Sequence, residues 1–265
     1  MGIKLYIIYL SLAFTFHFIS WRFPFREQAS NSEKRWDLVA VLAGKVFSLT
    51  YIALIGAPVF LLLTHETALV QWRDTVNSWP VIVSGLAQIL LIDFLLYWVH
   101  RSLHHQWLWH THAFHHAPKH LWWMSGLRAS PMHVVMMSLP FTISLIIFPT
   151  PEGAIITTIA IFVRIANQHW LHSNVKVPFE KHLEWVLVTP RLHFIHHSTK
   201  RKFSDSNYGF LFSCWDRIFG TLTTADQVPK NDKLGLNYDN TNMRLIFGLP
   251  PKSMQDTAEM KQAVE

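Results

Sequence analysis

Long apolar runs alternate with short polar, basic and aromatic segments over the first two thirds of the chain. A membrane-spanning helix needs about 20 mostly apolar residues. Residues 3–21, 38–63 and 80–99 meet this requirement. Residues 134–148 and 153–165 are shorter and flank Pro149 and Pro151, which predicts a tight helical hairpin that spans the bilayer or dips into it. The pattern therefore predicts an all-α, polytopic membrane protein with about four to five membrane helices.

The basic residues that follow these apolar runs are predicted to lie on the same side of the membrane. Arg22 and Arg26 follow the first run, Arg101 follows the third, and a group that begins with Lys176 follows the hairpin. Cytoplasmic loops carry the excess of Lys and Arg. We therefore expect a multi-pass protein of the bacterial inner membrane or endoplasmic reticulum. Its cytosolic, histidine-rich helical cap begins near residue 167. No small-residue cleavage site follows the first run, which favours a retained anchor over a signal peptide.

Composition narrows the class of protein further. Half of the 265 residues are hydrophobic and 15% are charged, against about 25% charge in a soluble domain. The net charge is +6. Because the basic residues flank apolar runs, a membrane surface is the expected partner and nucleic acid is not. The single cysteine, Cys214, excludes an internal disulfide, a thiolate-rich zinc site and an iron–sulfur cluster.

Histidines recur at spacings of three and four residues in three clusters. The clusters are His100 and His104, then His112, His115 and His116, and later His193, His196 and His197. On a helix these spacings place imidazoles on one face. Imidazole is the commonest metal ligand in proteins, and eight are more than one ion needs. The sequence therefore predicts a two-metal centre.

Two polar residues share a helix face with the first cluster. Asp93 and Tyr97 lie on the same stripe as His100 and His104 when residues are placed about 100° apart. A carboxylate inside an apolar run is costly unless it has a role. We expect Asp93 or Tyr97 to orient a metal-bound imidazole through its other ring nitrogen.

The ligand type alone leaves the metal open. Zinc, iron and copper all accept imidazole. Two zinc ions would indicate a membrane hydrolase, and two iron ions would indicate an enzyme that activates dioxygen. A metal transporter would place its ligands at mid-membrane depth, whereas nearly all the histidines here lie beyond the ends of the apolar runs.

The clusters and their flanks resemble the fatty acid hydroxylase/sterol desaturase superfamily. The matching motifs run from residue 93 to 104, 112 to 116 and 190 to 198, followed by Asn207-Tyr208-Gly209 and the run from Trp215 to Thr221. Because they occur in the family's order, the resemblance is specific. It implies a catalytic domain at residues 80–223, between N-terminal transmembrane helices at 1–79 and a cytosolic tail at 224–265.

The resemblance implies that the eight clustered histidines hold two iron ions, with zinc as the alternative in purified protein. It adds His172, which precedes Ser173-Asn174, as a ninth ligand. Some family members have a tenth histidine where this chain has Gln168, so His169 and His133 are the candidates for a tenth ligand. Four polar residues are expected to support the ligands without binding metal: Asp93, Tyr97, Asn207 and Asp216.

The activity implied by the resemblance is that of a membrane-bound, non-haem di-iron oxygenase. It would hydroxylate or desaturate a lipid, such as a sterol, a fatty acyl chain or an ether lipid, using dioxygen. The sequence contains no flavin or nicotinamide fingerprint and no haem-ligand motif. Electrons are therefore expected from a separate protein of the cytochrome b5, ferredoxin or reductase type. A di-zinc membrane hydrolase and a metal transporter remain the alternatives.

Overall fold

The computed structural model describes residues 2–63, 66–148, 151–241 and 243–251. Over these residues the chain forms helices and two isolated β-bridges, without a β-strand, so the all-α prediction is confirmed. The helices are α1 (Gly2–Arg22), α2 (Asn31–Tyr51), α3 (Ala57–Leu63), α4 (Thr67–Asn77), α5 (Val81–Leu103), α6 (Trp109–His116), α7 (Pro131–Ile147), α8 (Pro151–His172), α9 (Glu180–Leu183), α10 (Pro190–His196), α11 (Arg201–Ser204) and α12 (Cys214–Ile218). The polar tail expected at 252–265 lies outside the described residues.

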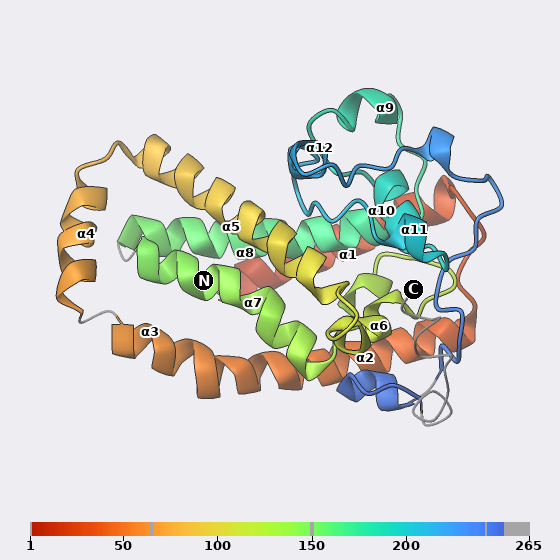
Figure 1. Ribbon diagram of the computed structural model, residues 1–265, viewed down its shortest axis with the longest axis horizontal. Coiled ribbons are helices and arrows are strands. Elements are labelled where there is room, and N and C mark those ends of the chain that lie inside the picture. Colours follow the sequence, from red (N-terminus) through yellow and green to blue (C-terminus); the bar gives the residue numbers. More distant parts are fainter. Residues whose placement is uncertain (1, 64–65, 149–150, 242, 252–265) are drawn as a thin grey trace.

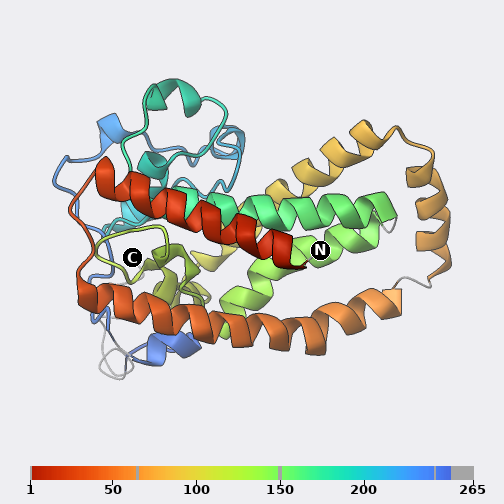
Figure 2. The same cartoon turned by 180° about the vertical axis from the view of Figure 1, so that it is seen from behind.

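Long helices form one half of the molecule and short helices form the other (Figures 1 and 2). Three described helical segments are long and apolar enough to cross a membrane: Asn31–Leu63, Val81–Leu103 and Gly153–His172. The helix α7 is apolar but shorter, and α1 fills the first predicted run. Large apolar side chains such as Leu54, Leu62 and Ile82 point outward. An outward apolar surface of this size is expected where lipid covers the protein.

The second span begins seven residues earlier than predicted, at Asn31. The Ser30 side chain accepts a hydrogen bond from the Glu33 backbone, and the Glu33 carboxylate accepts one from Ser30, which closes a capping box. Near its far end the span contains a π-helical turn, Ile52–Gly56. Pro58 follows two residues after this turn and has no N–H to donate, so a local change of hydrogen-bond register accommodates it.

The hairpin also departs from the prediction, because α8 continues to His172 instead of ending near residue 165. Polar residues on its last turns are accommodated inside the protein and not in lipid. The Asn167 side chain donates to the Phe210 carbonyl, and Gln168 donates to the Gly126 carbonyl. The extension carries His169 and His172 out of the bundle and into the cap.

Buried polar side chains join the spans to one another. The helix α5 packs against both α7 and α8, and α2 packs against α7. Gln88 of α5 donates to Ser144 of α7 at 2.9 Å and to the Gly153 carbonyl of α8 at 2.9 Å. The Tyr51 hydroxyl of α2 lies 2.7 Å from the Thr142 hydroxyl of α7. Hydrogen bonds of this kind hold helices together where lipid provides no hydrophobic driving force.

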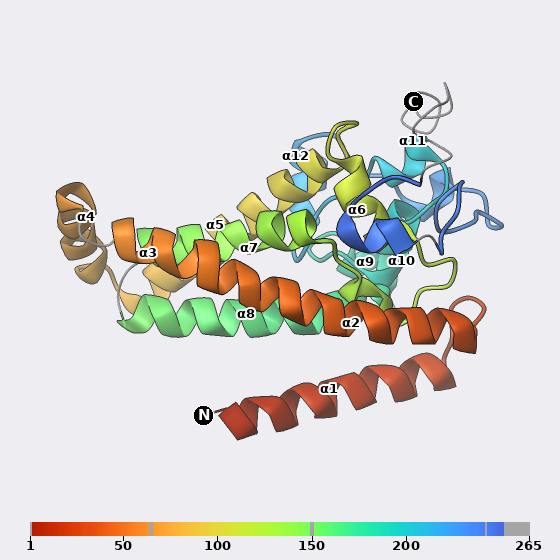
Figure 3. The same cartoon turned by 90° about the horizontal axis from the view of Figure 1, so that it is seen from below.

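The cap consists of α6, α9–α12 and the loops between them, and it lies at the opposite end from α4 (Figure 3). Its apolar core contains Trp109 and Phe114 of α6, which pack against Leu245 and Ile246 near the end of the described chain. Ala40 of α2 belongs to the same core. The cap is therefore fixed on the second span and cannot move as a separate unit without exposing this core.

One buried ion pair ties α2 to the segment that precedes α7. The Arg128 guanidinium binds the Asp37 carboxylate, and the two side chains are 4% and 1% exposed. Trp122 donates to the other Asp37 oxygen. Removing one partner of a buried pair leaves a desolvated charge, which costs far more than the intact pair contributes.

We expect Arg128→Met to lower the free energy of unfolding by about 3–5 kcal/mol, measured by denaturant titration in detergent. The double variant Asp37→Leu/Arg128→Met removes both charges and should recover most of that loss. Lys45→Met, on the exposed face of α2, serves as the control. Equal stability of the wild type and the single variant would contradict the assigned role of the pair.

Candidate metal centre

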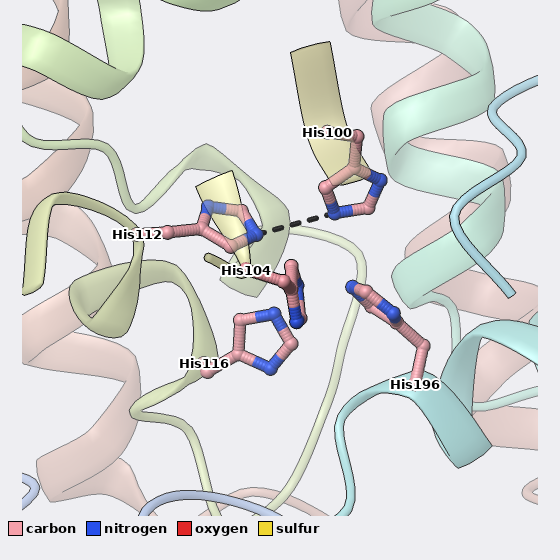
Figure 4. A group of neighbouring side chains, drawn as sticks. All are labelled: His100, His104, His112, His116 and His196. Atoms are coloured by element: carbon pink, nitrogen blue, oxygen red, sulfur yellow. Dashed lines mark hydrogen bonds between the residues drawn. The ribbon is translucent and has the colours of Figure 1, made fainter. Parts of the chain in front are cut away.

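Nine buried histidines form two groups whose ring nitrogens converge. Within each group, every histidine contributes one ring nitrogen, and these nitrogens all lie within 4.8 Å of one another. The first group contains His100, His104, His112, His116 and His196 (Figure 4). The second group contains His115, His172, His193 and His197. All nine histidines predicted as ligands are thus brought together, although no described group contains the two candidates for a tenth.

The two groups adjoin, because the motifs in α6 and α10 each supply both of them. The motif in α6 sends its outer histidines to the first group and its middle one, His115, to the second. The motif in α10 does the reverse and sends its middle histidine, His196, to the first group. The rings of His116 and His197 stack across the boundary with centroids 4.4 Å apart.

Local sequence explains how the ligands are presented. Thr189 caps α10 by accepting from the Leu192 backbone, and Pro190 occupies the first helical position, where a missing N–H costs nothing. The helix then places His193 and His196 on successive turns. Gly126 packs so closely on the His172 ring that a Cβ at this position would overlap it. The position therefore requires glycine.

Hydrogen bonding alone cannot explain the second group. The Nε2 atoms of His172, His193 and His197 form a triangle with edges of 3.0, 3.1 and 3.2 Å. Each neutral Nε2 carries either a proton or a lone pair, so two of the three atoms must be alike. At least one edge is then repulsive. Nitrogens bound to one ion at 2.0–2.1 Å lie about 2.9–3.4 Å apart, so a shared cation satisfies all three.

The first group also contains nitrogens that a metal would satisfy. The Nε2 atoms of His104, His116 and His196 are buried without a hydrogen-bond partner, and each such orphan costs about 1–3 kcal/mol. Burial, together with neighbouring imidazoles, holds the pKa of His104 and His116 well below the usual value. Neutral imidazole is the form that binds metal. The residues present therefore fit two metal ions.

A short segment after α11 orients three ligands of the first group. The His196 Nδ1 donates to the Ser206 carbonyl at 2.7 Å, and the His100 Nδ1 donates to the Tyr208 carbonyl at 2.9 Å. The His104 Nδ1 lies 3.1 Å from an Asp205 carboxylate oxygen. These bonds fix the tautomer that leaves Nε2 available for metal. We call residues 205–213 the support loop.

Two of the predicted supporting residues hold the support loop in place. Asn207 adopts a left-handed backbone conformation with φ 54°, which Asn tolerates better than most residues. Its side chain donates to the Leu192 carbonyl and accepts from the Thr223 backbone. The Asp216 carboxylate accepts from the backbone of Tyr208 and Gly209, each at 2.8 Å.

The expected contact of Asp93 or Tyr97 with an imidazole is not what the structure shows. Asp93 accepts from the backbone of Leu211 and Phe212 and from the Trp215 indole. The Tyr97 hydroxyl lies 2.9 Å from the Thr221 hydroxyl, which itself donates to Asp216. Asp93 therefore joins α5 to the support loop, and Tyr97 joins α5 to Thr221, whereas other groups orient the imidazoles.

The two candidates for a tenth ligand lie just outside the groups. The His133 Nδ1 is 2.9 Å from the outward nitrogen of His112, so His133 orients that ligand. Ser130 caps α7 by accepting from the His133 backbone and fixes its position. The His169 Nδ1 donates to the Trp123 carbonyl at 2.9 Å, and its ring packs against Trp123. Neither side chain joins the ligand nitrogens that face one another.

Comparison with known proteins agrees with this geometry. The model of the fatty acid hydroxylase family matches residues 85–221, more than half of the chain. The chain belongs to the fatty acid hydroxylase family. The match begins inside α5 and ends just beyond α12, so it includes every histidine of the two groups. The predicted resemblance is confirmed.

Curated relatives of this fatty acid hydroxylase family member carry the names of lipid oxidoreductases. Human alkylglycerol monooxygenase is 30% identical over 51% of this chain and 30% of its own length. Human lathosterol oxidase is 27% identical over 67% of this chain and 58% of its own. Ornithine lipid hydroxylase of Rhizobium tropici is 28% identical over 62% and 48%. The chain thus spans about a third to three fifths of these relatives' lengths. No solved structure matches it.

Sequence reasoning missed Asp205 and the role of His133 in this hydroxylase-family site. Asp205 lies 101 positions from His104, and no spacing rule connects an acid to a histidine that far away. The sequence shows an acidic residue between the third histidine motif and Asn207, but it does not show which histidine this residue contacts. The Arg128 carbonyl, which accepts from His115 Nδ1 at 3.3 Å, is a backbone group that no residue pattern marks.

We expect Asp216→Asn to weaken metal binding by about 10–100-fold, because it places an amide N–H₂ against backbone donors and loosens the Tyr208 carbonyl that orients His100. Competition with a chromophoric chelator would measure the affinity. Asp226→Asn, at an exposed position, should bind metal as the wild type does. Unchanged affinity in Asp216→Asn would show that the support loop does not tune the ligands.

Proposed function

We propose that the protein is a membrane-bound di-iron oxygenase that hydroxylates or desaturates a lipid. The observation that carries the proposal is the pair of adjoining imidazole groups, with five and four members, that share the motifs of α6 and α10. An octahedral ion held by four or five imidazoles retains at least one position for oxygen. Family membership and the names of the relatives support a lipid as the molecule oxidised.

Bound iron would supply dioxygen activation and oxidation of an unactivated C–H bond. The chain's own residues would hold the two ions through the nine imidazoles of the two groups. The outward nitrogens of His196 and His100 donate to the Ser206 and Tyr208 carbonyls, so these two imidazoles are oriented before substrate arrives. The burial of all nine side chains excludes bulk water and protects a reactive oxidant from side reactions.

A cavity of about 460 Å³ supports a route for the lipid to the metal centre. His104, whose side chain is buried, lines it together with Asp205, Ser102 and Leu108. Trp98, 40% exposed on the last turns of α5, lines its mouth together with Arg101. Because this mouth lies where a membrane span ends, an alkyl chain can enter from the bilayer while Arg101 contacts its polar group.

The basic residues that follow the spans support an orientation with the cap in the cytoplasm. The histidines support an enzyme over a metal transporter, because the ligands of α5 and α8 lie at or beyond the final turn of each helix. A di-zinc hydrolase would use the same ligands. It differs from the proposed oxygenase in the metal it retains and in having no requirement for dioxygen.

The test compares His196→Ala with His182→Ala, since both remove an imidazole but His182 is exposed on α9. Untagged wild-type protein should retain about two iron ions and oxidise a cellular lipid with incorporation of ¹⁸O from labelled dioxygen, or with loss of two hydrogens. His196→Ala should lose activity at least about 100-fold and lose metal. His182→Ala should match the wild type.

Lipids of cells that carry and lack the gene, compared by mass spectrometry, would supply the candidate substrate. A stable zinc pair without iron, and no lipid change that depends on dioxygen, would refute the oxygenase. Wild-type metal content and turnover in His196→Ala would refute the ligand assignment.

The cavity makes a separate prediction. Ser102→Phe fills it from a lining position that is not a proposed ligand, so metal content should stay at the wild-type value while kcat/KM for the lipid falls at least about tenfold. Ser102→Ala is the matched control and should retain activity. Full activity in Ser102→Phe would show that the lipid reaches the metals by another route.

A further inference from the structure

A second cavity is lined by segments that lie at the end of the molecule farthest from α4; Figures 1 and 3 show where these segments run. It has a volume of about 920 Å³. The loop between α1 and α2, the segment after α6 and residues 230–240 line it. It is separate from the cavity that reaches His104.

The rim of this cavity is basic. Lys119, Lys230 and Lys233 line it and are exposed. Asp232 also lines it but is buried, and Lys200 neutralises it from 3.4 Å. The remaining acid, Glu27, is outnumbered by the three exposed lysines. A partner that fits this rim therefore presents negative charge, because complementary potentials steer association and fix orientation.

The inner wall of the cavity belongs to the metal centre. Phe194 lines the cavity and lies on α10 between His193 and His196. The Gly235 backbone, next to the lining residue Leu234, donates to the His197 carbonyl at 3.1 Å. The cavity thus contacts the helix that carries histidines of both groups.

The rim is also pre-ordered. The Asn174 side chain accepts from the Phe25 and Arg26 backbones at 2.9 and 2.7 Å and donates to the Arg26 carbonyl at 2.8 Å. Asn174 follows His172 by two residues, so the loop between α1 and α2 is fixed to the end of α8. Because this surface is already ordered, docking of a partner costs little conformational entropy.

We propose that this cavity, with Lys119, Lys230 and Lys233 on its rim, is the docking site for an acidic one-electron carrier protein. The proposal rests on the oxygenase function above. Two reduced carriers each lose one electron, and with dioxygen, two protons and the lipid they give hydroxylated lipid and one water. Electrons enter through the membrane-distal face, while the lipid approaches through the cavity at the end of α5.

The experiment uses iron-loaded protein in nanodiscs and follows oxidation of the reduced carrier by stopped flow. The probes are a [2Fe–2S] ferredoxin and the haem domain of cytochrome b5, both acidic, with basic cytochrome c for comparison. Dithionite serves as the small-molecule reductant. In the variant Lys230→Glu/Lys233→Glu, we compare the rate constant for reduction of the protein by the acidic carrier with that for its reduction by dithionite. This ratio should fall at least about tenfold at low salt. Its dependence on ionic strength should weaken as well.

The matched control is Lys181→Glu, because Lys181 lies on α9 outside the cavity. The acidic carrier should reduce this variant at the same relative rate as the wild type. The docking site is refuted if neither acidic carrier reduces the wild type faster than cytochrome c, or if the double variant keeps the wild-type ratio. Failure of dithionite to reduce any bound metal would instead refute the oxygenase, so the two failures are distinguishable.

Discussion

The structure depends on one constraint, which is the burial of nine uncharged imidazoles around two small interiors. Imidazole nitrogens that face one another cannot all be satisfied by hydrogen bonds, as the triangle of His172, His193 and His197 demonstrates. A cation removes the conflict, and its binding energy then contributes to folding. The cap must therefore hold the rings so that one nitrogen of each faces inward, and for several of them, such as His100 and His196, the other nitrogen donates to a protein acceptor. The support loop, the caps of α7 and α10 and the close packing at Gly126 all serve that requirement.

The same constraint couples the membrane helices to the chemistry. The helix α5 ends in the first group and α8 ends in the second, so two spans fix the position of the histidine groups relative to the apolar helices. Asp93 extends this coupling, because it binds the support loop from inside α5. A tilt or sliding of either span would move ligands directly. The rigidity of the bundle, with Gln88 joining three helices, is thus part of the metal site.

Much of this arrangement could be predicted from residue spacing and some of it could not. Apolar length identified the spans, and the spacing of histidines identified eight of the nine clustered residues, because both signals are local along a helix; the ninth, His172, came from the family resemblance. Spacing could not show that His115 and His116, adjacent in sequence, belong to different groups, since that depends on how α6 meets α10. Nor could it pair His104 with Asp205 or Asp37 with Arg128 across about a hundred residues. Asp93 was singled out correctly as a polar residue with a role, but its partners are backbone groups that carry no sequence signature.

The exchange of middle histidines between the motifs of α6 and α10 has a consequence for how the centre is assembled. Each motif is a single short helix that serves both ions, so ordering one helix around its first ion also places a ligand for the other. If the two groups bind metal as proposed, loading would be cooperative, because the first ion would order a helix that also presents a ligand for the second. The two proposed sites would then form one unit, and loss of one would disturb the other.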